Sequence, residues 1–150
     1  MTALNKMSLL EIKLKRLDEI FRTVIIVVSL AISASSVNLN LFFLLFPLFI
    51  WSIGHGMNRF KYLEFFFKLL AWFHLSFATT VTIFKATLGV ATLGSALIIF
   101  CAYFSALTTH IVISWFSDTL DVEQVHHLRK NLTTLMLAFF PVVFYYPQFV

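Results

Sequence analysis

Apolar residues dominate five stretches of this chain, and short polar segments separate them. The apolar runs cover about residues 20–36, 39–53, 62–88, 94–117 and 132–148. They lack the strict alternation of a barrel strand, and in a bilayer every backbone polar group must be bonded within the chain, so helices are expected. The pattern predicts an all-α integral membrane protein, a bundle of four to five transmembrane helices in one domain over residues 1–150.

A basic amphipathic helix is predicted over about residues 4–19, before the first span. Its apolar side chains recur at spacings of three and four, at Met7, Leu10, Leu14, Leu17 and Phe21. The pattern places charged residues such as Lys13 and Asp18 on the remaining faces. Such a helix can lie in the membrane interface, dock a partner subunit or continue into the first span as one long rod.

The number of transmembrane helices depends on the lengths of the apolar runs and on the breaks within them. The first two runs are short for a hydrocarbon core of about 30 Å, which needs about 20 helical residues, and Pro47 is expected to kink the second. The long run from residue 62 to 116 holds two spans, with the hinge expected around Gly89 and Gly94. The last run contains Pro141 and Pro147; it gives five spans if it crosses the bilayer and four if it is re-entrant.

The charge distribution supports the membrane prediction and gives it an orientation. Hydrophobic residues make up 60% of the chain and charged residues 12%, and a soluble domain cannot hide so much apolar surface. Ten of the eleven Lys and Arg residues fall in residues 6–22, 59–68 and 129–130. Because basic residues concentrate in cytoplasmic segments, we expect a cytoplasmic N-terminus. The net charge of +4 then reflects topology, so no nucleic-acid partner is expected.

Two histidines inside the apolar runs are the candidate cofactor ligands. His74 lies in the third run and His110 in the fourth. A histidine inside a membrane is costly unless it is bonded. If the hinge is centred near residue 91, the two side chains lie at nearly equal depth and could ligate a b-type haem; a hinge at residue 86 would separate them. The alternative is that each histidine bonds a hydroxyl or a carbonyl across the bundle.

The polar segment before the last run holds a candidate metal site. Glu123, His126 and His127 form an E-x-x-H-H pattern, which on one helical turn can present a carboxylate and an imidazole to one metal ion. Carboxylate di-iron sites require a second such motif, and the chain contains no other. The alternative interpretation is a solvated, charged helical turn.

Small and polar residues form two stripes that predict helix packing or, in an oligomer, a pore lining. They recur at intervals of three, four or seven along the third and fourth runs. The residues are Ala71, Ala78, Thr82, Lys85, Ala91, Ser95, Ala102 and Ala106.

Three functions are consistent with these patterns. The first is a structural or accessory subunit of a larger membrane complex, which packs against lipid and against other membrane subunits. The second is a homo-oligomeric channel or small carrier, and the third is a haem-binding electron-transfer subunit. The chain lacks H-E-x-x-H, G-x-S-x-G and P-loop motifs, and we expect no catalytic activity of its own.

Overall fold

The computed structural model describes residues 2–34, 42–89 and 93–145, with side chains omitted for 42–43 and 135–145. Within these ranges the chain forms five α-helices and no strand: α1 (Ala3–Ala34), α2 (Phe42–Gly56), α3 (Lys61–Leu88), α4 (Ser95–Phe116) and α5 (Val122–Tyr145). The predicted all-helical bundle is confirmed. Two of the helices, α3 and α4, are long and apolar enough to cross a bilayer. Length and composition alone do not distinguish such helices from the core helices of a soluble protein.

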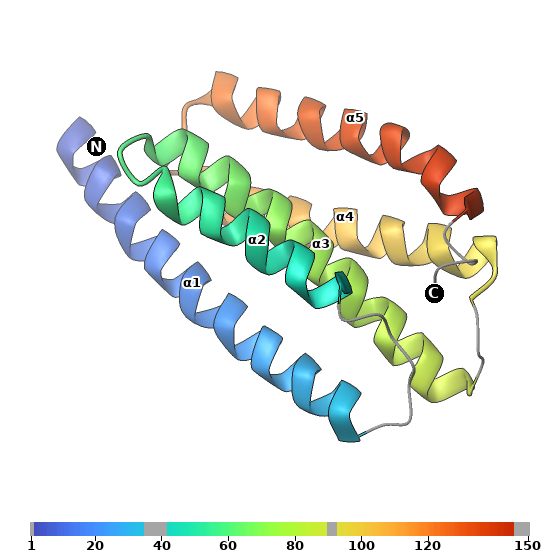
Figure 1. Cartoon of the computed structure of the whole chain (residues 1–150). Coiled ribbons are helices and arrows are strands. Elements are labelled where there is room, and N and C mark those ends of the chain that lie inside the picture. Colours follow the sequence, from blue (N-terminus) through green and yellow to red (C-terminus); the bar gives the residue numbers. More distant parts are fainter. Residues whose placement is uncertain (1, 35–41, 90–92, 146–150) are drawn as a thin grey trace.

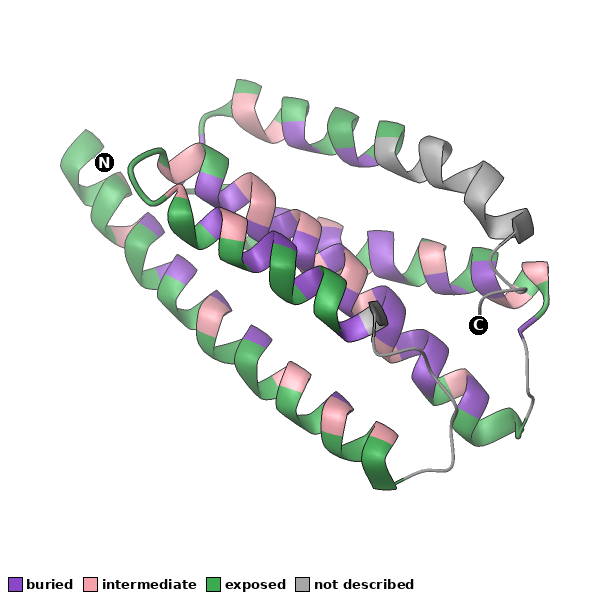
Figure 2. Ribbon diagram, viewed as in Figure 1, coloured by how far each residue is buried: buried purple, intermediate pink, exposed green. Residues whose placement is uncertain are grey.

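Helix α3 is the centre of the bundle. It packs against α2 on one side, α4 on another and α1 on a third, while α5 packs on α4 (Figure 1). Figure 2 shows the buried residues concentrated along α3 and on the facing sides of its neighbours. The main core gathers around Phe65, Phe73 and Phe116, and a smaller cluster around Phe77 and Ile98 lies near the α3–α4 connection.

Helix α1 is one continuous rod of 32 residues, about 48 Å long at 1.5 Å per residue. The predicted amphipathic segment and the apolar run that follows it therefore form a single helix. Its buried stripe contains four of the five predicted residues, Leu10, Leu14, Leu17 and Phe21. Met7, the fifth, is 48% exposed, because it lies near the free end of the helix. Lys13 belongs to this stripe as well and is 9% exposed, so its placement on a charged outer face was wrong.

Two helix boundaries have clear local causes. Helix α3 ends where Gly89 adopts a left-handed conformation with φ of 62°, which glycine accepts without steric cost, and its N–H donates to the Lys85 carbonyl. Helix α5 begins at Val122, ten residues before the predicted run, so most of the polar segment is helical rather than a loop.

Candidate functional site

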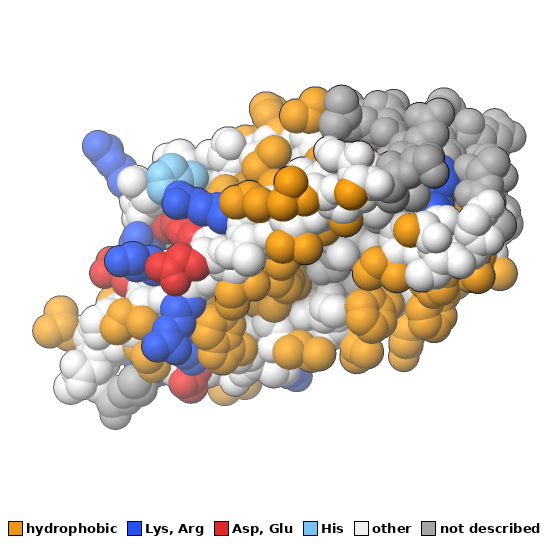
Figure 3. All heavy atoms as spheres, turned by 90° about the horizontal axis from the view of Figure 1, so that it is seen from below, with side chains coloured by type: hydrophobic (Ala, Val, Ile, Leu, Met, Phe, Trp, Pro, Cys, Tyr) orange, Lys and Arg blue, Asp and Glu red, His pale blue; other side chains and the backbone are white. Residues whose placement is uncertain are grey.

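Charged side chains gather at one end of the bundle, where the first half of α1 meets the start of α3 and the α4–α5 turn. Figure 3 shows most of the charged side chains in that view clustered at this end, beside a largely apolar surface. Ion pairs connect α1 to α3 and to the α4–α5 turn at this end. This cluster is the most highly organised polar feature of the described residues.

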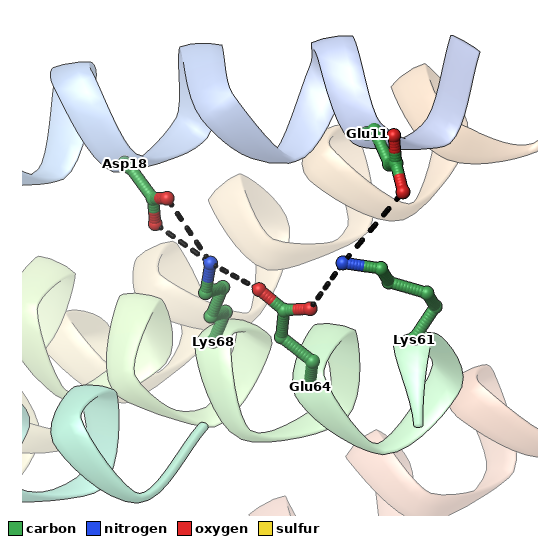
Figure 4. Close-up of polar contacts among 5 residues, drawn as sticks. All are labelled: Glu11, Asp18, Lys61, Glu64 and Lys68. Carbon is green, nitrogen blue, oxygen red and sulfur yellow. Dashed lines mark hydrogen bonds and ion pairs between the residues drawn. The ribbon is translucent and has the colours of Figure 1, made fainter. Parts of the chain in front are cut away.

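Lys68 is the centre of the cluster. Its side chain is 1% exposed, and its Nζ lies 2.9 Å from Asp18 Oδ1 and 2.7 Å from Glu64 Oε1 (Figure 4). The ammonium group also lies 5.1 Å from the centre of the Trp51 ring, within range of a cation–π interaction. One lysine therefore joins α1, α2 and α3.

The network continues toward the end of the bundle through Glu64. Its second carboxylate oxygen lies 3.3 Å from Lys61 Nζ, and Lys61 lies 3.9 Å from Glu11 on α1 (Figure 4). Positive and negative groups alternate along this path, so each buried charge faces an opposite one. Such compensation matters because an unpaired buried charge is strongly destabilising.

Lys13 makes a second attachment of α1, to the end of α4. Its ammonium donates to the Trp115 carbonyl at 2.6 Å and to the Asp118 carboxylate. The hydrogen bond from Lys13 holds the pKa of Asp118 below its usual value. A third ion pair, which is more exposed, joins the start of α1 to the α4–α5 turn: Lys6 Nζ lies 3.6 Å from Asp121 Oδ1.

Close packing of α2 on α3 positions the lysine and its aromatic neighbour. A Cβ added to Gly54 would lie 3.0 Å from Phe67 Cβ and 3.3 Å from the Glu64 carbonyl, so only glycine fits there comfortably. Trp51 in turn stacks on Phe21 of α1, with ring centres 3.8 Å apart and planes within 12°. The ring stack and the ion pairs thus hold the same three helices.

The two predicted haem ligands lie at similar depth. The antiparallel register of α3 and α4 is given by two ring contacts, Phe84 with Phe100 and Phe65 with Phe116. In this register His74 lies opposite the helical turn of α4 that ends at His110. The Nδ1–H of His74 donates to the Leu70 carbonyl at 2.9 Å, on its own helix rather than across the bundle. Its ring packs edge-on against Phe46 of α2.

His110 is half-buried on α4. Because Nδ1 of His74 carries the proton of its bond to Leu70, Nε2 of the neutral ring has a lone pair, which is the arrangement that histidine ligands use. Haem ligation by His74 and His110 stays a prediction.

The predicted metal residues lie on the first turns of α5. His127 Nε2 is 3.6 Å from Glu123 Oε1, and the rings of His126 and His127 have centres 6.3 Å apart and planes inclined at 62°. All three side chains are exposed. Across the described parts of the chain, no three His, Cys, Asp or Glu residues form a group that could hold a metal ion.

Most of the predicted packing stripe lies inside the bundle. Ala71, Ala78, Thr82, Lys85 and Ala106 are buried, Ser95 and Ala102 are half-buried, and Ala91 falls outside the described residues. The Thr82 hydroxyl donates to the Ala78 carbonyl of its own helix, so it needs no partner on another helix.

Sequence reasoning did not identify the charge network as a site. Two signals were present in the sequence. Glu64 and Lys68 are four residues apart on one helical face inside an apolar run, and Lys13 is three residues from Leu10 and four from Leu17, on the apolar stripe. Asp18 as the distant partner of Lys68 had no comparable signal, because it depends on how α1 packs on α3.

The arrangement is suited to attaching helices. The Lys68 ammonium is directed at two carboxylates and an aromatic face, which leaves it poorly placed to act as a nucleophile. Comparison of the chain with protein families, with curated proteins and with solved structures found no match.

Proposed function

We propose that this chain is a multi-pass membrane protein that acts as a structural or accessory subunit of a larger membrane complex. The observation that carries this proposal is the outward surface of α4. Opposite its buried face, α4 exposes an apolar stripe from end to end, made of Ile99, Phe100, Tyr103, Phe104, Leu107, Ile111 and Trp115. These residues recur at helical spacing, so they form one surface.

The stripe has the dimensions of a membrane contact. From Ile99 to Trp115 it extends about 24 Å at 1.5 Å per residue, most of a hydrocarbon core of about 30 Å. Water tolerates such a continuous apolar surface poorly, whereas lipid tails or a neighbouring helix cover it at no cost. Its aromatic residues also offer large contact areas to a partner helix.

The proposed orientation follows from the charged end. We place the charge network at the cytoplasmic side, with the N-terminus on the same side, because basic residues are retained there. In this arrangement the second half of α1, then α2, α3, α4 and α5 cross the bilayer. Helix α2 has 15 residues, about 22 Å, so flanking residues or local thinning of the bilayer must complete its span.

Site-specific photo-cross-linking in native membranes tests the proposal. A photoreactive residue in place of Leu107, on the exposed stripe, should cross-link to a different polypeptide. The same residue in place of the neighbouring Ala106, which is 3% exposed, should react only within the chain. Resistance of the protein to carbonate extraction from membranes is a further expected result.

The same experiment separates the competing functions. Cross-links at Leu107 between copies of this chain alone would favour the homo-oligomeric channel or carrier. Reaction with lipid alone would contradict the subunit proposal, and release of the protein by carbonate would contradict the membrane location. A haem absorbance band that is lost on replacing His74 would favour the electron-transfer subunit.

A further inference from the structure

A groove of about 390 Å³ lies between α1 and α2, beside the Phe21–Trp51 ring stack. Its volume is within the range of about 300–1,000 Å³ that is usual for small-molecule sites. Besides the two stacked rings, it is lined by Arg22, Ile25, Ile26, Leu48, Ser52 and His55.

The groove is polar at one end and apolar at the other. The stacked rings set the register of the two helices, which run in opposite directions. His55 lies one turn from Trp51 toward the charge network. Ile25 and Leu48 lie about one turn from the stack in the opposite direction. The apolar end continues onto exposed surface, since Ile26 is 58% exposed.

Arg22 is one residue after Phe21, beside the ring stack, and is available to a ligand. Within the described chain it makes no ion pair, and Asp18, one turn before it on α1, is already engaged by Lys68. Glu19 is the remaining acid within one turn, and its side chain is exposed. The Ser52 hydroxyl donates to the Leu48 carbonyl and therefore offers a ligand only acceptor capacity. Arg22 and His55 are thus the donors of the groove, and a guanidinium favours phosphate oxygens.

We propose that this groove binds an anionic phospholipid, with its phosphate at Arg22 and His55 and the start of an acyl chain along Ile25, Ile26 and Leu48. The inference rests on the membrane location in the proposed function. A partner helix fits less well, because a helix about 10 Å wide occupies about 400 Å³ per turn and would place only one turn in the groove. An acyl chain is thinner and can follow the groove from its polar end to its apolar end.

Native mass spectrometry of the full chain in detergent tests the inference. Phosphatidylglycerol and phosphatidylcholine with identical acyl chains are added in turn, and the bound lipid is counted. We expect the anionic lipid to be retained preferentially and Arg22→Gln to weaken its binding by about tenfold, the effect of losing a charge-assisted hydrogen bond. The matched control is Arg16→Gln, which removes an exposed charge from the same helix outside the groove.

A second pair of variants tests the apolar end independently. Ile26→Trp should fill the groove and reduce lipid retention, whereas Ile12→Trp, at another exposed isoleucine of α1, should leave retention unchanged. Circular dichroism confirms that each variant is folded.

Three outcomes would overturn the lipid site. They are equal retention by the Arg22 and Arg16 variants, no effect of Ile26→Trp, and displacement of the lipid by equimolar glycerol phosphate, which would identify a free phosphate site. These results do not bear on Leu107 cross-linking or carbonate extraction, so failure of the lipid site is distinguishable from failure of the proposed function.

Discussion

Replacing Lys68 by methionine is the sharpest test of the charge network. Methionine keeps most of the side-chain length and removes the ammonium that lies between Asp18 and Glu64. Glu64, whose side chain is 6% exposed, retains only Lys61 at 3.3 Å, and Asp18 loses its ion pair. The cation–π contact with Trp51 is lost as well.

The expected cost is large for a single substitution. Removing one partner of a buried ion pair destabilises proteins by about 3–5 kcal/mol, because the remaining charges stay buried without compensation. The matched control is Lys15→Met, which removes an exposed lysine of α1 and should change stability by less than about 0.5 kcal/mol. Unfolding by SDS in mixed micelles, followed by tryptophan fluorescence, measures both variants.

A triple variant separates lost attraction from uncompensated charge. Adding Asp18→Asn and Glu64→Gln to Lys68→Met removes the carboxylates as well, and we expect most of the lost stability to return. The reasoning is refuted if Lys68→Met is no less stable than Lys15→Met, or if the triple variant is as unstable as the single one.

Three further predictions concern packing, pH and thiol access. Gly54→Ala should destabilise the bundle by about 1–3 kcal/mol through overpacking, whereas Gly56→Ala, with no atom within 4 Å of the added Cβ, should be neutral in the same unfolding assay. Asp118→Ala should lower stability at neutral pH, and its difference from the natural chain should shrink as pH falls below about 4 and disappear only below the lowered pKa of Asp118 in the folded protein. The sign follows because a carboxyl with a lowered pKa stabilises the fold above its unfolded pKa and loses that contribution as pH falls through the folded one. Cys101, which is fully buried, should react with a maleimide only after denaturation; rapid labelling of the folded protein would contradict its place in the core.

Local pattern was sufficient to predict where α3 and α4 begin and end. Their apolar runs are long, and Gly89 and Gly94 interrupt them, so a boundary within a residue or two of the observed ones could be read directly. The left-handed conformation of Gly89 gives the physical reason for the break. The start of α5 was harder to predict, because a solvated polar helix carries little apolar periodicity.

The charge network could not be predicted because its partners are distant in sequence. Asp18 is 50 residues from Lys68, and Asp118 is 105 residues from Lys13. Which carboxylate meets which lysine depends on how α1 packs on α3 and on the end of α4, information that periodicity within one helix does not contain. Lys13 was also misplaced because a lysine on an apolar stripe is usually excluded from the core, and only its bond to the Trp115 carbonyl and its ion pair explain its burial.

The long-range attachment of α1 has a consequence for biosynthesis. Helix α1 is made before α2 to α5, and Lys68 and Asp118 are made 50 and 105 residues after the charges that they neutralise. At about 5–20 residues per second, Asp18 waits about 3–10 s and Lys13 about twice as long for a partner. During that interval both charges must stay hydrated, because an unpaired charge is costly to bury. The docking of α1 is therefore a late step, which is complete only when the α4–α5 turn has emerged.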